Sequence, residues 1–260
     1  MDREYIAQLT GLSVIEIEAL ASRLVNVQQS VSQAALAAGR NPAEITLIGV
    51  SKFLPASMAA AAVYLGLHDL GENRVQEMLA KQDDLSAQDL HPAWHLIGTL
   101  QKNKVKYLLG RTALIHSVDS AELLEEIASR STKAGFVTDV LLQVNTAHEA
   151  TKHGFDPDEL LASAGRFSSQ TGVRIRGLMT MAPLFEDPEM SRPVFAQTQA
   201  LFAMLAAGPL GSETFNILSM GMSQDYSQAI ACGATHVRIG TAIFGPRPPL
   251  ESIRPDPGPL

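Results

Sequence analysis

The sequence predicts a single (β/α)8 barrel of the TIM type, preceded by an extra N-terminal helix. Short apolar runs rich in β-branched residues alternate with longer stretches of helical periodicity, the pattern of a parallel sheet covered by helices. Eight such runs are present, which favours a closed barrel over the alternative, an open doubly wound sheet. The chain has 260 residues, a common length for a barrel of this kind.

The first long helix is expected over residues 13–38, before the first strand. Apolar side chains recur there at the spacing of one helix face. Ser13 and Glu16 have the spacing of a capping box at its start, and Gly39 follows its last turn. This helix is therefore an addition to the barrel itself.

Strands and helices then alternate to the end of the predicted barrel. The strands are expected at residues 45–51, 68–71, 94–98, 114–118, 138–145, 174–181, 215–220 and 236–240. The helices between them are expected at residues 56–66, 73–83, 101–109, 120–134, 157–168, 190–206 and 224–232. The strand at 68–71 has the least support because its apolar run is very short.

One folded domain is expected, because no linker or composition break interrupts this alternation. We assign residues 1–12 to an N-terminal tail and residues 13–247 to the barrel. Residues 248–260 are rich in proline, which predicts an extended or disordered tail.

Composition limits the classes of function. The net charge of −7 argues against non-specific nucleic-acid binding. The first twelve residues have acidic and polar side chains where a signal peptide has a basic start and an apolar run, and no run of about 18 apolar residues is present, so we expect neither a signal peptide nor a membrane span. The single cysteine, Cys232, excludes an intramolecular disulfide, and no cluster of Cys and His suggests a metal site. We expect a cytoplasmic monomer with no nucleic-acid or membrane partner.

Candidate functional residues follow the strands, because function in a parallel barrel is concentrated at the C-terminal strand ends. Lys52 follows the first strand directly. After the seventh strand, Ser223 is expected to begin a helix, where its hydroxyl and neighbouring N–H groups can bind an anion. After the eighth strand, Gly240 and Thr241 offer further N–H groups and a second hydroxyl. Barrels commonly bind a phosphate between these last two loops.

An amine on the first strand and a phosphate site on the last two strands are neighbours in a closed barrel. This pairing suits a phosphorylated aldehyde held as a Schiff base on Lys52, and pyridoxal phosphate is the obvious candidate. Arg238 lies two residues before Gly240, on the same face of the strand, so it can hydrogen-bond the pyridine nitrogen. Because arginine does not readily give up a proton, that nitrogen would stay unprotonated and the ring would be a poor electron sink.

Each of these residues also has an ordinary structural interpretation when it is taken alone. Lys52 can be a surface lysine, Gly240 with Thr241 a plain turn, and Arg238 a structural ion-pair partner. His95 and His116 are expected to be packed, hydrogen-bonded histidines rather than acids or bases, and Cys232 is expected to be a small buried hydrophobe.

The motifs at the strand ends resemble those of the pyridoxal phosphate homeostasis proteins, a family similar to the barrel domain of alanine racemase. The matching stretches follow in order through nearly all of residues 13–247: "GVSK", "GENRVQE", "WHLIGTLQKNK", "HSVDS", "QVNTAHEATKHGF", "RGLMTMAP", "LSMGMSQD" and "VRIGTAIFG". The resemblance implies Lys52 as the Schiff-base lysine, Ser223, Gly240 and Thr241 at the phosphate, Arg238 at the ring nitrogen, and Asn73 near the ring face or hydroxyl.

The resemblance further implies a protein that binds pyridoxal phosphate and balances its supply, with no established reaction. Pyridoxal-phosphate-dependent apoenzymes are then the expected recipients. The loop "NTAHEATKHGF" matches the family less closely, but Lys152 and Gly154 stand at the family's positions. A role for Lys152 in cofactor exchange is one implication.

Three functions compete for this chain: a cofactor-binding and delivery protein, an amino-acid racemase-like enzyme that uses the same cofactor, and a class I aldolase-like enzyme that uses Lys52 on a sugar phosphate. A racemase of the alanine racemase type resembles this barrel but takes its second base, a tyrosine, from an additional β-domain. None of the four tyrosines falls at a predicted strand end: Tyr64, Tyr107 and Tyr226 lie in predicted helices, and Tyr5 lies in the N-terminal segment. This placement favours the cofactor-binding protein over a racemase. An aldolase would show no bound chromophore when purified, so the colour of the purified protein distinguishes it from the cofactor-binding protein.

Overall fold

The computed structural model describes residues 2–147 and 153–246 and shows a closed barrel of eight parallel strands in sequential order. The strands are β1 (Thr46–Val50), β2 (Asp69–Glu72), β3 (Ala93–Leu96), β4 (Leu114–Val118), β5 (Thr138–Gln143), β6 (Val173–Met179), β7 (Ile217–Ser219) and β8 (His236–Ile239). Strand β1 pairs with both β2 and β8, which closes the ring.

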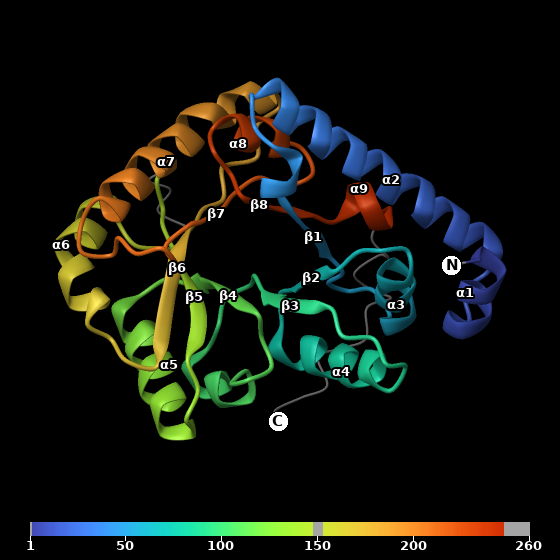
Figure 1. Cartoon of the computed structure of the whole chain (residues 1–260), viewed down its shortest axis with the longest axis horizontal. Helices are drawn as coiled ribbons and strands as arrows, with labels where there is room; N and C mark the ends of the chain where they lie inside the picture. The colour runs from blue at the N-terminus through green and yellow to red at the C-terminus, as the bar shows by residue number, and fades with distance from the viewer. Residues whose placement is uncertain (1, 148–152, 247–260) are drawn as a thin grey trace.

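Helices cover the outside of this barrel (Figure 1). They are α1 (Arg3–Thr10), α2 (Val14–Ala37), α3 (Ala56–Tyr64), α4 (Val75–Ser86), α5 (Ala121–Ala134), α6 (Pro157–Ser168), α7 (Arg192–Ala206), α8 (Tyr226–Ala231) and α9 (Thr241–Phe244), with short 3-10 helices at Pro42–Glu44, Lys102–Tyr107 and Pro188–Ser191. No helix within the described part of the chain is both long and apolar enough to cross a membrane.

The predicted alternation is confirmed for all eight strands, including the short strand expected at 68–71. Residues 101–109, expected as an α-helix, form instead the 3-10 helix Lys102–Tyr107. Lys102 and Lys106 would face each other one turn apart in an α-helix, and like charges at that spacing disfavour it. Gly110 then turns the chain at a φ of 71°.

The N-terminal segment assigned to a tail contains a helix. Asp2 caps α1 by accepting a hydrogen bond from the Glu4 N–H, and Gly11 ends it in the left-handed conformation. Ile6 and Ala7 are buried against the rest of the molecule. Two buried positions in eight residues are too few to give a clear periodic pattern, so the sequence did not indicate this helix.

Helix α2 has the capping box that the sequence predicts. The Ser13 hydroxyl accepts from the Glu16 N–H at 3.3 Å, and the Glu16 carboxylate accepts from the Ser13 N–H at 2.8 Å. The helix packs across α8 and α9. Its Arg23 donates to the carbonyl oxygens of Ile243 and Phe244 at 2.7 and 3.3 Å. The added N-terminal helix therefore supports the end of the chain segment that follows β8.

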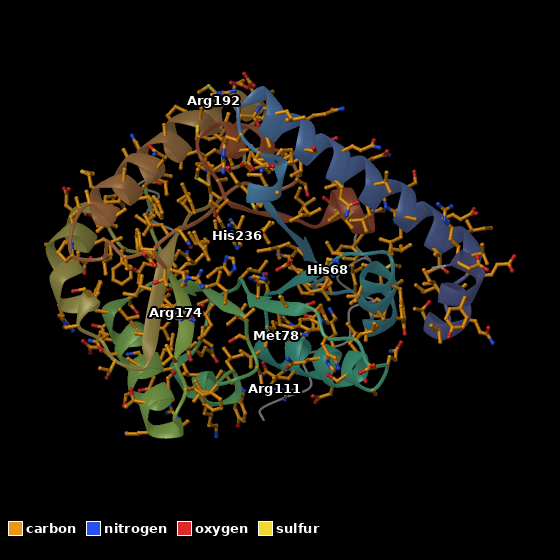
Figure 2. All side chains as sticks on the ribbon, viewed as in Figure 1. His68, Met78, Arg111, Arg174, Arg192 and His236 are labelled. Carbon is orange, nitrogen blue, oxygen red and sulfur yellow. The ribbon has the colours of Figure 1, made fainter. Side chains whose placement is uncertain are left out.

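The interior of the barrel is partly apolar and partly polar. One apolar cluster inside it consists of Leu114, Leu141, Met179 and Ile217. Buried polar side chains share the interior, among them His95, His116 and Arg238, and His236 lies near the barrel axis (Figure 2). The larger apolar core fills the layer between the strands and the covering helices. Hydrogen bonds link His95 to His116, and His116 through Ser219 to Arg238, which lines the functional site described below.

Candidate functional site

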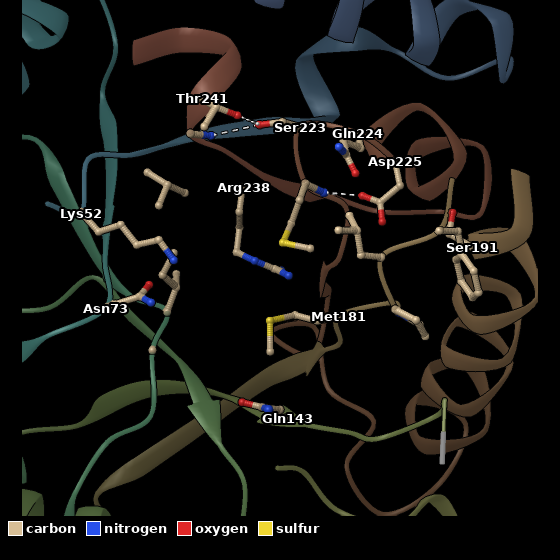
Figure 3. Close-up of a pocket in the computed structure, with 18 of the residues that line it drawn as sticks. Lys52, Asn73, Gln143, Met181, Ser191, Ser223, Gln224, Asp225, Arg238 and Thr241 are labelled. Carbon is tan, nitrogen blue, oxygen red and sulfur yellow. Dashed lines mark hydrogen bonds between the residues drawn. The ribbon is translucent and has the colours of Figure 1, made fainter. Parts of the chain in front are cut away.

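A cavity of about 510 Å³ lies at the C-terminal ends of the strands. Its lining includes every site residue expected from the sequence: Lys52, Asn73, Ser223, Arg238, Gly240 and Thr241 (Figure 3). These residues come from the ends of four strands, β1, β2, β7 and β8, and closure of the barrel brings them together. The location is the one that a parallel barrel predicts for a ligand site.

Lys52 stands on the turn that follows β1. Side chains two residues apart share a face of a strand, so Lys52 continues the inward face of Val50, and both line the cavity. Figure 3 shows the lysine side chain directed into it. The next residue, Phe53, has a φ of 67°, which is unusual for a residue with a bulky side chain. The turn is therefore held in a specific conformation.

A buried cluster of charges holds this turn from beneath. The Lys81 amine donates to the Ser51 carbonyl oxygen and to Glu72 Oε1 at 2.7 Å each, and to Glu77 Oε1 at 2.8 Å. Glu77 Oε1 also accepts the Phe53 N–H at 2.6 Å. The backbone on both sides of Lys52 is thus anchored to one group of charges. Sequence reasoning missed the cluster, although the spacing of Glu77 and Lys81 is that of a helical ion pair.

Glu72 is the unusual member of that cluster. It is fully buried, Oε1 accepts from the Ser51 hydroxyl at 2.6 Å, and no partner is described for Oε2. Burial raises the pKa of Glu72 to about 7, although Lys81 lowers it. This carboxyl group can therefore change its protonation state near neutral pH.

The opposite wall of the cavity is made by the loops after β7 and β8. Gly240 N lies 3.4 Å from Ser223 Oγ, and Thr241 Oγ1 lies 3.5 Å from the same oxygen. Two hydroxyl groups and one backbone N–H thus converge at one place. This donor set suits a phosphate.

Ser223 does not begin a helix, contrary to the sequence expectation. Helix α8 starts three residues later, at Tyr226. The Asp225 carboxylate accepts the Met222 N–H at 2.6 Å and forms a turn that includes Ser223. Gly221 has a φ of 94°, and a Cβ there would lie 2.7 Å from Ala229 Cβ. Ser223 therefore contributes its hydroxyl from a loop, whereas Gly240 and Thr241 stand at the N-terminus of the short helix α9.

Arg238 forms the floor of the cavity. Its side chain is buried, with NH1 donating to Ser219 Oγ at 2.6 Å and NH2 donating to the Thr180 carbonyl oxygen at 2.9 Å. These bonds use two of the five N–H donors of a guanidinium. Burial lowers the pKa of Arg238 to about 10, so it remains a cation at neutral pH. It can therefore only donate to a ligand.

Asn73 lies at the side of the cavity, just after β2. Gly98 permits its position, because a Cβ on Gly98 would lie 2.4 Å from the Asn73 carbonyl oxygen. Gln143 and His153 also line the cavity, and the Gln143 amide donates to the His153 carbonyl oxygen at 2.9 Å. Both were missed by sequence reasoning, which examined charged groups and phosphate loops. Lys152 lies outside the described residues.

The expectation that His95 and His116 are packed and hydrogen-bonded is confirmed. Both are buried, and His95 Nδ1 lies 2.9 Å from His116 Nε2. Cys232, expected to be buried, is only half-buried at the end of α8. Its sulfur lies 3.9 Å from the Arg192 carbonyl oxygen. Helix α8 is short and ends at this residue, which leaves the thiol at the edge of the packed layer.

Comparison with known proteins agrees with this geometry. The family model described as "Alanine racemase, N-terminal domain" matches residues 16–248. A pyridoxal phosphate homeostasis protein of Aquifex aeolicus is 42% identical over 229 residues, which are 86% of this chain and 97% of the relative. The protein of the same description from Pseudomonas aeruginosa is 38% identical over 228 residues, with 88% and 96% covered.

Solved structures show the same fold. PipY of Synechococcus elongatus is 36% identical and superimposes with a TM-score of 0.77 without PLP and 0.76 with PLP bound, covering 87% of this chain and all of PipY. Alanine racemase of Corynebacterium glutamicum has a TM-score of 0.67 at 14% identity, over 88% of this chain and 60% of the racemase, which is a likeness of fold alone. The resemblance seen in the sequence is thereby confirmed, and the chain belongs to the family of pyridoxal phosphate homeostasis proteins.

Proposed function

We propose that this protein binds pyridoxal phosphate reversibly, as a Schiff base on Lys52, and takes part in the homeostasis or delivery of that cofactor in the cell. One observation supports the proposal most directly: a lysine, a buried arginine and a cradle of hydroxyl and N–H donors line a single cavity. The names of the relatives and the PLP-bound structure of PipY support the same ligand.

The residues of the cavity fit the parts of this ligand. Ser223, Gly240 and Thr241 would hold the phosphate, and Arg238 would donate to the ring nitrogen. Asn73 would contact the ring face or its hydroxyl group. Apolar side chains that line the cavity, Val50, Ile97 and Met181, would flank the ring. When bound, the cofactor supplies an aldehyde, which condenses with an amine by loss of one water.

The first experiment tests the covalent link. Protein incubated with pyridoxal phosphate is treated with borohydride, digested and analysed by mass spectrometry. We expect the reduced adduct on the peptide that contains Lys52, and we expect Lys52→Ala to lose both the adduct and the yellow absorbance. The exposed Lys106, replaced by alanine, is the matched control and should retain both. An unchanged absorbance band in Lys52→Ala would refute the assignment.

A second candidate function is a racemase-like enzyme, and one observation favours it. His153 lines the cavity, so an imidazole that could act as a base is present there, which was not expected from the sequence. Its side chain is 67% exposed, and Nδ1 lies 3.5 Å from Asp119 Oδ2. The four tyrosines lie in α1, α3, the 3-10 helix at 102–107 and α8, and none is at a strand end, as predicted. His153 is therefore the residue to vary in a test for catalysis.

Delivery requires that the ligand leaves again. We propose pyridoxal-phosphate-dependent apoenzymes as recipients, and the monomeric state and cytoplasmic location stay predictions. In one arrangement, a dialysis membrane separates the loaded protein from an apoenzyme, and in the other the two proteins are mixed. Comparing activation of the apoenzyme in the two arrangements distinguishes simple release of the cofactor from transfer on contact. Activation of the apoenzyme in neither arrangement would contradict delivery.

A further inference from the structure

A line of polar side chains crosses the barrel interior from the cavity floor toward the N-terminal ends of the strands. Its members come from β2, β3, β4, β7 and β8: Asp69, His95, His116, Ser219 and Arg238. The successive distances are 3.0 Å from Asp69 Oδ1 to His95 Nε2, 2.9 Å from His95 Nδ1 to His116 Nε2, 2.9 Å from His116 Nδ1 to Ser219 Oγ, and 2.6 Å from Ser219 Oγ to Arg238 NH1. Adjacent groups are thus within hydrogen-bond distance along the whole line.

The two ends of this chain determine the direction of every bond within it. Arg238 can only donate, and an ionised Asp69 can only accept. Ser219 accepts from Arg238 and so has its own proton to give to His116 Nδ1. A neutral His116 that accepts at Nδ1 carries its proton on Nε2 and donates it to His95 Nδ1. His95 in turn carries its proton on Nε2 and donates it to Asp69.

Burial supports neutral rings in this chain. His116 is fully buried, and burial, followed by the neighbouring His95 and Arg238, places its pKa well below the ordinary value. His236 lies beside both rings, with centroid distances of 6.3 Å to His95 and 6.4 Å to His116. Burial lowers the pKa of His236 to about 4, so it adds no charge at neutral pH. Arg176 also faces His236, but its NH1 donates to Asp139 at 2.6 Å.

A single added proton on His95 would reverse the direction of the hydrogen bonds from His95 to Ser219. If His95 became an imidazolium, its Nδ1 would donate, and His116 would have to accept at Nε2 and donate at Nδ1. Ser219 would then accept from both His116 and Arg238, and its own proton would have no acceptor among these groups. A buried donor without an acceptor is unfavourable. The neutral arrangement is the one that satisfies every member.

The end of the hydrogen-bond chain that lies away from the cavity, at Asp69, is accessible to solvent. His95 lines a second hollow, of about 600 Å³, together with the first residues of several strands. The Asp69 side chain is 25% exposed. Within the described residues, no three groups from His, Cys, Asp and Glu are arranged to hold a metal ion. The histidines are therefore linked to each other and to Arg238, not to a metal centre.

We propose that His116 and Ser219 are positioning residues for Arg238, acting through a one-way hydrogen-bond chain that ends at Asp69 and holds both histidines as Nε2–H tautomers. The chain fixes the rotamer of the guanidinium, so that its remaining donors are aimed at the ligand ring. This last step rests on the proposed binding of pyridoxal phosphate. The histidine tautomers and the direction of the hydrogen-bond chain do not depend on that proposal.

The first test uses the ligand-free protein labelled with 15N-histidine. Long-range 1H–15N spectra distinguish the two neutral tautomers from the imidazolium. At pH 7.5, which is about one unit above the ordinary histidine pKa, we expect His95 and His116 as Nε2–H tautomers, and the signal of the exposed His91 serves as an internal reference. Ser219→Ala should release His116 from its fixed tautomer. An imidazolium, or an Nδ1–H tautomer, at either ring in the unaltered protein would overturn the proposal.

The second test compares affinities for pyridoxal phosphate and for its 1-deaza analogue, in which C–H replaces the ring nitrogen. The unaltered protein should prefer pyridoxal phosphate by about tenfold, the value of one hydrogen bond to a charged group. Ser219→Ala and His116→Leu should abolish that preference, and His116→Gln, which can accept and donate at its two ends, should restore most of it. Equal losses for both ligands in Ser219→Ala would mean a merely structural role and overturn the proposal. Failure of the unaltered protein to bind either ligand would refute the proposed function. The tautomer spectra would still test the direction of the hydrogen-bond chain.

Discussion

The Lys81 amine lies 2.7 Å from Glu72 Oε1 inside the protein, beneath the turn that carries Lys52. Both partners are buried, since Lys81 is 4% and Glu72 0% accessible to solvent. A buried pair is costly to break, because the remaining charge loses its partner without regaining water. The pair therefore links the stability of the fold to the position of Lys52.

At a pH above 7, where Glu72 is ionised, replacing Lys81 with methionine should destabilise the protein by about 3–5 kcal/mol, the usual cost of leaving one buried charge unpaired. Chemical denaturation measures this loss. The exposed Lys133 on α5, replaced by methionine, is the control and should change stability by less than about 0.5 kcal/mol. The double variant with Glu72→Gln should recover part of the loss. A Lys81→Met variant as stable as the control would show that the pair contributes nothing.

The raised pKa of Glu72 predicts a pH dependence of stability. Its ordinary value of 4.5 rises to about 7 in the fold, so the native state holds this proton more tightly than the unfolded chain. The resulting stabilisation is complete below pH 4.5 and is lost as the pH rises through 7. The free energy of unfolding should therefore fall by about 3 kcal/mol from this group alone, at about 1.4 kcal/mol per pKa unit.

Glu72→Gln isolates this contribution. Denaturation curves from pH 5 to 8 should show a smaller fall in stability for Glu72→Gln than for the unaltered protein. Exposed Glu122, replaced by glutamine, should leave the pH profile unchanged. Parallel profiles for Glu72→Gln and the unaltered protein would mean that Glu72 stays ionised throughout this range, held so by Lys81.

The phosphate cradle predicts a selective loss of affinity. Thr241→Ala removes one hydroxyl donor, and the loss of a hydrogen bond to a charged group costs about 1.5–3 kcal/mol, or roughly ten- to a hundredfold in affinity. Binding of pyridoxal phosphate should therefore weaken more than binding of unphosphorylated pyridoxal. Thr241→Ser keeps the hydroxyl and should bind almost normally. Equal losses for the phosphorylated and unphosphorylated ligands would place the phosphate elsewhere.

The sequence was sufficient to predict that Lys52, Ser223, Gly240 and Thr241 surround one cavity. A general rule explains this success, because the C-terminal strand ends of any closed parallel barrel converge. The rule requires only the order of the strands, and the alternating pattern supplies that order. The prediction that Ser223 begins a helix was wrong, because the Asp225 carboxylate captures the Met222 N–H and delays the helix.

The polar chain through the barrel could not be predicted in the same way. His116 and Ser219 are 103 residues apart, and their contact depends on strand register and on individual rotamers. Alternation along a strand indicates which side chains point inward, but not which inward groups meet across the barrel. The same limit applies to Lys81, whose helical position gives no sign that its amine reaches the Ser51 carbonyl oxygen.

The last prediction is that the loaded protein does not turn over alanine or other common amino acids. Arg238 is a cation at neutral pH, since its pKa stays near 10 despite burial. A cation that donates to the ring nitrogen keeps that nitrogen unprotonated, so the ring stabilises a carbanion poorly. Proton removal and return would then need well-placed bases on both faces of the substrate.

Lys52 could serve one face, and His153 is the candidate that the structure offers for the other. Its ring is largely exposed and lies near Asp119, whereas a general base must come within about 3 Å of the proton it removes. The loaded protein is incubated with single-enantiomer amino acids in deuterated water, and exchange of the α-proton is followed by NMR. We expect no exchange at enzyme-like rates of about 1 s⁻¹ or faster. Exchange at such rates that disappears in both Lys52→Ala and His153→Gln would replace the carrier with a two-base racemase, because a background reaction of the free cofactor would not depend on either side chain.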